Sequence, residues 1–352
     1  MDILIGILEQ GMIYAIMALG VYITYKILDF PDLTVDGSFP LGAAITVMLM
    51  TKTDSNFIAT LTLGHNPYII MLFAFISGGI AGLVTGIIHV KFQVRDLLSG
   101  IITMTALYSI NLHIAGKANL PIFNMDTIFS NKVIDSIYPE IFAKYKVLII
   151  ISIVTIGAKI FMDLYLQTRS GYLLRAVGNN PVVVTSLAKD SGSVKILGLV
   201  IANALVALSG SVMSQQQGFF EISMGTGAVV IGLATVIIGT NLFRKISFVK
   251  STTAVIIGSI LYKLCISLAM DVSLGVIVAV VVAVLSIVYV NKDRYLKIIM
   301  TIIASVTSYF LCKILIPYDI SASDMKLVTS VFFLLILIIG REQKRRGSSV
   351  GA

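Results

Sequence analysis

Long apolar runs alternate with short polar segments along most of the chain. A helix needs roughly 20 apolar residues to cross a bilayer, whereas a barrel strand needs only about 10, in alternation with polar ones. The runs have the helical length, and the polypeptide backbone must satisfy its own hydrogen bonds in lipid. The pattern therefore predicts an all-α fold, a polytopic transmembrane helical bundle of about 9–11 spans. The expected spans are 3–26, 39–51, 67–90, 97–115, 147–166, 195–216, 225–243, 251–270, 273–290, 296–316 and 325–340.

One of the short spans, 39–51, follows an irregular segment. The preceding residues read FPDLTVDGSFP, residues 30–40, and are rich in Pro, Gly and Asp. Irregular backbone at membrane depth persists only where it is buried in protein or lines a wet cavity. The sequence therefore predicts one or two short or broken helices, with a break near the end of the first span.

Composition supports the membrane class. The 352 residues are 57% hydrophobic and 12% charged, with a mean hydropathy of +0.97. A soluble domain carries roughly 25% charged residues, so a water-soluble fold is excluded. The net charge of +8 does not indicate a nucleic-acid partner, because the cations cluster between spans.

The distribution of cations predicts an orientation. If segment 167–195 lies in the cytoplasm and the spans alternate, most of the 26 lysines and arginines fall on that same side. Cytoplasmic loops of membrane proteins carry this excess of positive charge. We therefore expect the N-terminus outside and the C-terminus in the cytoplasm.

The polar segment between two apolar runs reads LRAVGNNPVVVTSLAKDSG, ending at Gly192. It predicts one short helix from Tyr172 to Val177 that closes at Gly178. It predicts a second helix that starts at Asn180, because Asn caps helices well and Pro suits the first helical position. Gly192 would end that helix. Two roles are open: a rigid docking helix for another protein, or a surface helix resting on lipid headgroups.

Three stretches carry a family resemblance. They run from Gly11 to Ala44 (GMIYAIMALGVYITYKILDF and onward), from Thr168 to Gly239 (TRSGYLLRAVGNNPVVVTSL and onward), and from Tyr318 to Ser330 (YDISASDMKLVTS). They resemble the permease subunits of ABC importers of the branched-chain amino acid superfamily, and more narrowly the branch of tryptophan and tyrosine importers.

The resemblance implies a single permease domain, 1–352, in the plasma (inner) membrane, with a cytoplasmic coupling loop at 168–194. The implied partners are two cytoplasmic ABC ATPase subunits, an extracellular substrate-binding lipoprotein and a second permease subunit within membrane lipid. That second subunit is either a sister subunit or, as expected first, an identical copy in a homodimer. The coupling residues that match the family's loop are Arg175, Gly178, Asn179, Asn180, Pro181, Leu187 and Lys189.

Residues 272–317 depart from the family pattern. In the family, a segment like Gly258–Met270 leads almost directly into the DMKL segment, whereas here a stretch long enough for a helical hairpin intervenes. With an offset of 47 residues, Tyr262 and Cys265 recur as Tyr309 and Cys312, and two origins are open: a duplicated helix pair or a chance match. We therefore expect an additional helical hairpin at 272–317.

The sequence lacks the motifs of the common enzyme and metal sites. It has no GxxxxGK[ST] loop and no HExxH motif, and its three histidines are scattered. We expect no catalytic residue and no metal site. The chain would bind no cofactor itself, and ATP and Mg would bind the partner ATPases.

Polar residues within the spans are candidates for a translocation pathway. Such groups are costly in hydrocarbon unless they bond to a neighbour or face water. Asn203, Gln215 and Gln216 accumulate along one span, Thr235 lies in a Gly-rich span, and Thr103, Thr105 and Asn111 mark a third. The alternative role is helix–helix packing through hydrogen bonds and small residues, and for the glutamines both roles are open.

Three charged residues are further pathway candidates. Asp32 and Asp36 flank the predicted break, where each would line the pathway or cap the next helix. Lys263 lies in the middle of a span, where a charge indicates function or an ion pair. Glu221 and Asp271 are its candidate partners.

The function that the family resemblance implies is ATP-driven import of amino acids, aromatic ones first, by alternating access. The runner-up is a permease for branched-chain amino acids or another small metabolite. A secondary transporter driven by an ion gradient is less favoured, because acid-rich spans are absent from the sequence.

Overall fold

The computed structural model describes residues 2–51, 62, 65–123, 125–131, 134, 136, 144–180, 184, 190–244 and 248–270. The chain divides into two compact units, Met1–Ile260 and Leu261–Ala352. Of the second unit, the structure describes only residues 261–270, which form the C-terminal half of one helix.

The first unit is built from membrane-length helices. In chain order they are α1 (Asp2–Val21), α2 (Val35–Thr51), α4 (Pro67–Val90), α5 (Asp96–Ala115), α7 (Lys146–Leu166), α10 (Ser191–Gln217), α11 (Ala228–Leu242) and the start of α12 (Ser251–Met270). Shorter elements are the π-helix η1 (Tyr22–Ile27), α8 (Arg169–Asn179) and the 3₁₀-helix η3 (Ile222–Gly225), with strands β1 (Asn119–Pro121) and β2 (Phe219–Glu221).

Every span predicted before residue 271 coincides with one of these helices, and the mostly helical fold is confirmed. Among the described residues, six helices are long and apolar enough to cross a membrane, while Val35–Thr51 and Ser251–Ser267 are shorter apolar helices. The protein is therefore a multi-pass membrane protein. The spans predicted at 273–290, 296–316 and 325–340, and the hairpin at 272–317, lie outside the described residues.

The predicted break follows the first helix. The last turns of that span form η1, in which the Leu28 N–H donates to the Ile23 carbonyl at 2.9 Å. Residues 28–34 then run without helical structure and α2 begins at Val35. Phe30, Asp32 and Thr34 are buried in this connection, as irregular backbone at this depth requires. The α2 helix itself is continuous, with Pro40 inside it.

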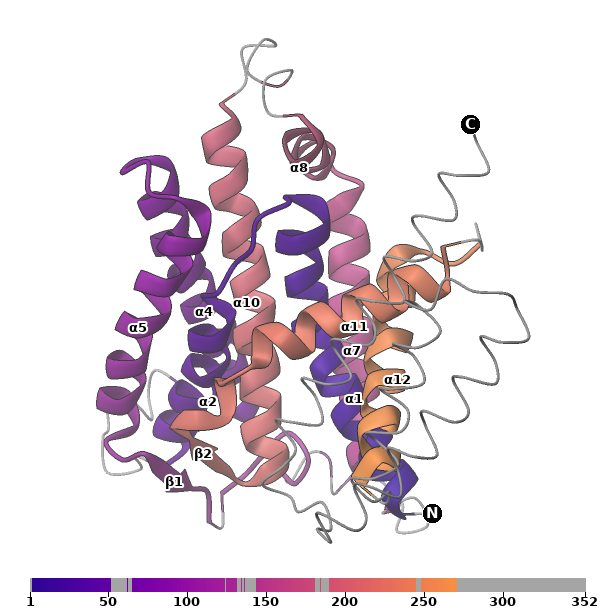
Figure 1. Ribbon diagram of the computed structural model, residues 1–352. Coiled ribbons are helices and arrows are strands. Elements are labelled where there is room, and N and C mark those ends of the chain that lie inside the picture. The colour runs from indigo at the N-terminus through magenta and orange to yellow at the C-terminus, as the bar shows by residue number, and fades with distance from the viewer. Residues whose placement is uncertain are drawn as a thin grey trace, which may run out of the picture. The chain divides into compact units, whose positions relative to one another are not determined.

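The central helix of the first unit is α10, which packs against α4, α2 and α1 (Figure 1). Small residues allow this close packing. A Cβ atom at Gly42 of α2 would overlap the carbonyl oxygen of Ala207, and one at Gly210 of α10 would overlap that of Phe39. Hydrogen bonds cross the same interface, including Thr46 Oγ1 to Ser211 Oγ at 2.7 Å. Small residues and interhelical hydrogen bonds are the usual basis of helix association in lipid.

Two short strands were not predicted. β1 and β2 pair antiparallel, with Leu120 opposite Phe220. They join the segment after α5 to the segment after α10, at the end of the unit opposite α8 (Figure 1). This pairing fixes the start of η3, since the Ile222 N–H donates to the Ala118 carbonyl at 2.9 Å.

Candidate functional site

The first candidate site is the end of the bundle that carries α8. This helix follows α7 directly, and Thr168 caps it: the Thr168 hydroxyl accepts a hydrogen bond from the Gly171 N–H at 3.2 Å. A capped N-terminus satisfies otherwise unpaired backbone donors and so fixes where the helix begins. The prediction that this helix spans Tyr172–Val177 is too short, because α8 runs from Arg169 to Asn179.

One face of α8 is fixed to the membrane helices. Leu174 and Val177 are fully buried, and Leu174 lies against the α10 backbone at Gly198. Gly178 packs on η1 so closely that a Cβ atom there would overlap the carbonyl oxygen of Ile27. The sequence suggested that Gly178 closes the helix. It lies inside the helix, and its lack of a side chain instead permits contact with η1.

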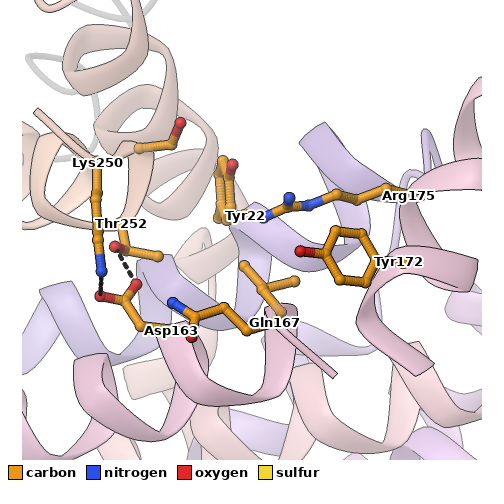
Figure 2. Close-up of a pocket in the computed structure, with 9 residues that line it drawn as sticks. Tyr22, Asp163, Gln167, Tyr172, Arg175, Lys250 and Thr252 are labelled. Carbon is orange, nitrogen blue, oxygen red and sulfur yellow. Dashed lines mark hydrogen bonds and ion pairs between the residues drawn. The ribbon is translucent and has the colours of Figure 1, made fainter. Parts of the chain in front are cut away.

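The opposite face of α8 is exposed and borders a cavity. Tyr172 is 60% exposed, and Arg175 and Asn179 are also exposed. The cavity has a volume of about 250 Å³. Figure 2 shows Arg175 reaching across it toward Tyr22 of η1. The other residues that line it come from α7, α8 and the start of α12: Asp163, Leu166, Gln167, Tyr172, Lys250, Ser251 and Thr252.

The charged groups around this cavity differ in their pairing: Asp163 is paired with lysines, whereas the Arg175 guanidinium bonds to none of the described residues. The Asp163 carboxylate already accepts hydrogen bonds from Lys159 Nζ at 2.8 Å, Lys250 Nζ at 3.3 Å and Thr252 Oγ1 at 2.6 Å. Among the described residues, none forms a hydrogen bond or ion pair with the Arg175 side chain. An exposed guanidinium presents several donors in a planar fork suited to a carboxylate. This face of α8 can therefore bind an acidic group of another molecule.

Other cations lie at the same end. Lys26 is in the last turn of η1, and Lys195 Nζ lies 3.4 Å from His89 Nε2, joining the start of α10 to the end of α4. The structure thus places Lys26, Lys195, Lys250 and Arg175 at one end of the helices, as the charge pattern of the sequence predicted.

The segment after α8 is only partly described. Asn180 follows the helix, and its N–H donates to the Ala176 carbonyl at 2.9 Å. Pro181, Leu187 and Lys189 lie outside the described residues, so the second predicted helix stays a prediction. The interpretation of Gly192 as its end is wrong, because Gly192 lies in the first turn of α10, where Asp190 is the N-cap. The Ser193 hydroxyl and the Gly192 and Ser193 N–H groups lower the pKa of the Asp190 carboxyl.

Two pathway candidates belong to a buried hydrogen-bonded network. Asn203 of α10 donates from Nδ2 to Asp32 Oδ2 at 2.8 Å and accepts from Ser38 Oγ at 2.7 Å. Asp32 also accepts from the Thr34 N–H at 2.9 Å. These bonds tie the irregular segment and α2 to α10, so Asn203 and Asp32 act as interhelical ties in this conformation.

Asp36 caps a helix distant in sequence. Its carboxylate accepts from the Gly227 N–H at 3.1 Å and from the Val229 N–H at 2.8 Å, at the start of α11. The interpretation that Asp36 caps the next helix in the sequence is therefore wrong, because the helix that it caps is α11. A negative charge at a helix N-terminus is favourable.

Comparison of this chain with known proteins shows the family to which it belongs. A model of the family described as branched-chain amino acid transport system / permease component matches residues 3–285. The chain belongs to this permease family. It is a membrane permease component of amino-acid transport and not an ATPase.

Two relatives of this permease are informative. It is 45% identical over 287 residues to the tyrosine transport system permease protein of Clostridioides difficile (strain R20291), covering 82% of this chain and 89% of that one. It is 32% identical over 279 residues to the uncharacterized protein RP368 of Rickettsia prowazekii (strain Madrid E), covering 78% and 91%. No solved structure matches this permease significantly.

The remaining pathway candidates of the first unit each bond to a different partner. Gln215 is buried and its Oε1 accepts from the Ile128 N–H at 2.9 Å. Gln216 donates to Glu9 Oε2 at 3.3 Å. The Thr235 hydroxyl donates to the Gly232 carbonyl within its own helix at 2.7 Å. Lys263 lies in α12 in the second unit, and its pairing with Glu221 or Asp271 stays a prediction.

Sequence reasoning did not assign the residues around α8 that complete the site. Tyr22 and Asp163 lie within apolar spans, Gln167 directly follows one, and none of the three was singled out. Asp163 carries a usable signal, because a lysine four residues earlier places both charges on one helix face. Lys250 and Thr252 join it through a contact between helices that no local pattern encodes.

Proposed function

We propose that this permease is the transmembrane subunit of an ATP-driven ABC importer for aromatic amino acids, working by alternating access. The name of the Clostridioides relative supports tyrosine as the first solute to test. Two ATPase subunits that bind ATP and Mg would act from the cytoplasm, and a substrate-binding lipoprotein would deliver solute from outside. A second copy of this chain would complete the pathway.

The observation that carries this proposal is the attachment of α8. Its inner face contacts η1, α7 and α10, and its outer face presents Arg175 and Asn179. A capped helix held at several points moves as one body with the membrane helices. A force applied to its outer face by an ATPase would therefore reach η1 and α10.

The direction of coupling follows from population shift. ATP changes the balance between inward-open and outward-open states only if the complex binds ATP more tightly in one of them. Contact between the ATPase and α8 would link this difference in ATP affinity to the conformation of the membrane helices. The gathering of Lys26, Arg175, Lys195 and Lys250 at the α8 end supports a cytoplasmic position for this end, with the N-terminus outside and the C-terminus inside the plasma (inner) membrane.

Uptake by a reconstituted complex tests the function. The permease, its two ATPases and its binding protein are placed in proteoliposomes, and labelled L-tyrosine is followed. We expect uptake with ATP and none with ADP or a non-hydrolysable analogue, and a collapsed ion gradient should change nothing. Excess tryptophan should compete more strongly than excess valine.

Two results would contradict the proposal. Stronger competition by valine than by tryptophan would assign the permease to branched-chain solutes. Uptake that continues without the ATPases and stops when an ionophore is added would indicate a secondary transporter. Liposomes with the ATPases and binding protein but without the permease serve as the control.

A further inference from the structure

A second cavity opens between α2, α5 and η3, away from α8. These three elements contact one another, and α2 and α5 lie side by side (Figure 1). Its volume of about 200 Å³ far exceeds the ~15 Å³ that one water molecule needs. The lining residues relevant to binding are Asp36 and Pro40 from α2, Thr105, Tyr108 and Asn111 from α5, and Thr226 after η3.

Asn111 is the feature that indicates a ligand. Its side chain is fully buried, and Nδ2 donates to the Gly37 carbonyl at 3.1 Å. Its other polar atom, Oδ1, has no hydrogen-bond partner among the described residues. Buried polar atoms in folded proteins are almost always paired, and an exception calls for a partner not yet in place. The partner that Oδ1 can take is a hydrogen-bond donor.

Asp36 adds a negative charge to the same wall. Its carboxylate accepts hydrogen bonds from two backbone N–H groups at the start of α11, and no lysine or arginine bonds to it in the described part of the chain. Each carboxylate oxygen can accept a further hydrogen bond, and the residue is partly exposed. Asp36 and Asn111 therefore present acceptors to one cavity, and that combination favours a cation with several donors.

The rest of the wall suits an aromatic side chain and a carboxylate. Tyr108, which is 55% exposed, and Pro40 and Met104 supply apolar area. The hydroxyls of Tyr108 and Thr226 can donate to a carboxylate. Small-molecule sites combine a mostly apolar wall with a few polar groups in this way.

We propose that this cavity binds the transported amino acid and holds its α-ammonium group between Asn111 Oδ1 and the Asp36 carboxylate. This inference rests on the proposed function, because it specifies where that solute binds. Asn111 Oδ1 would serve only to bind the ammonium group, whereas the Asp36 carboxylate would bind it and also hold α11 in place.

Thiol protection tests the assignment in the reconstituted complex without nucleotide. Thr105→Cys is made with Cys265 and Cys312 changed to Ser, and modification by a water-soluble thiol reagent is timed. We expect saturating L-tyrosine to slow modification at least fivefold. The same concentration of 3-(4-hydroxyphenyl)propionate, which lacks the ammonium group, should leave the rate unchanged. Lys117→Cys, exposed beyond the end of α5, is the control, with a rate that tyrosine does not alter.

Kinetics of a second variant test Asn111 itself. Asn111→Leu removes the unpaired acceptor, and we expect the KM for tyrosine to rise at least tenfold with kcat changed less than twofold. A purely structural role would instead lower the amount of assembled complex at unchanged KM.

The possible failures are distinguishable. If the wild-type complex imports tyrosine but Thr105→Cys is unreactive, unprotected, or protected equally by the deaminated analogue, the site assignment is wrong and the proposed function stands. If the wild-type complex does not import tyrosine, the proposed function itself fails.

Discussion

The Gly42→Ala variant should lose about 3 kcal/mol of stability, the upper end of the range of about 1–3 kcal/mol that overpacking of a filled interface typically costs. The added methyl group would overlap the carbonyl oxygen of Ala207 in α10. That oxygen belongs to a helix and cannot rotate away as a side chain would. The α2–α10 interface also holds Gly210 against Phe39, so separation of the helices would disturb both contacts.

Thermal unfolding of the purified permease in detergent measures this effect. Since a folded protein is stable by only about 5–15 kcal/mol, a loss of this size should lower the melting temperature clearly and reduce the yield of monodisperse protein. Gly157→Ala is the matched control. A Cβ atom at Gly157 of α7 meets nothing within 4 Å, and Ala favours a helix by about 0.5–1 kcal/mol over Gly. Equal melting temperatures for the two variants would contradict the interface described above.

The Gly178→Ala variant should uncouple transport from ATP hydrolysis. The methyl group would overlap the Ile27 carbonyl oxygen, so the end of α8 must move away from η1 and loosen the burial of Val177. Fully burying one such side chain contributes about 1.5–3 kcal/mol. A loss of free energy within that range changes the corresponding equilibrium constant tenfold or more, because ~1.4 kcal/mol corresponds to a factor of ten. We expect ATP-driven tyrosine uptake to fall at least tenfold, while the melting temperature falls no further than in Gly42→Ala and the complex still assembles.

Uptake, ATP hydrolysis and complex assembly are measured together on this variant. Hydrolysis should persist at a rate near that of the wild type, because α8 lies at the edge of the bundle and the ATPase carries its own site. Gly157→Ala again serves as the control and should transport normally. Normal uptake by Gly178→Ala would show that the contact between α8 and η1 does not transmit movement.

The membrane helices could be predicted well because their signal is local. A run of about 20 apolar residues has few alternatives to a spanning helix, and α4 was predicted with the bounds that the structure has, Pro67–Val90. The break after the first span was predicted for the same reason, since Pro, Gly and Asp disfavour a continuous helix.

Contacts between distant segments could not be predicted. Asp36 caps α11, which begins near residue 228, and Asn203 bonds to Asp32 across 171 residues of sequence. The pairing of β1 with β2 joins strands of three residues each, too short for a recognisable pattern. Such pairs depend on the packing of whole helices, which the local sequence does not encode.

Glycine was the residue most often misinterpreted. Gly178 and Gly192 were both read as helix ends because glycine favours the left-handed conformation that closes helices. In the structure both lie inside helices, against Ile27 and Val90 respectively. In a membrane bundle, close approach of helices is an equally common reason for glycine, and only the three-dimensional contact distinguishes the two.

The accessibility of α8 tests the central claim of this account, that the helix faces the cytoplasm and receives the ATPase. A single cysteine at Asn179, which is exposed at the end of α8, is labelled with a membrane-impermeant reagent in intact cells and in inverted membranes. Lys117→Cys provides the opposite control. We predict that Asn179→Cys reacts only in inverted membranes, is shielded when the ATPases bind, and forms a cross-link to them. Labelling of Asn179→Cys in intact cells would contradict the account.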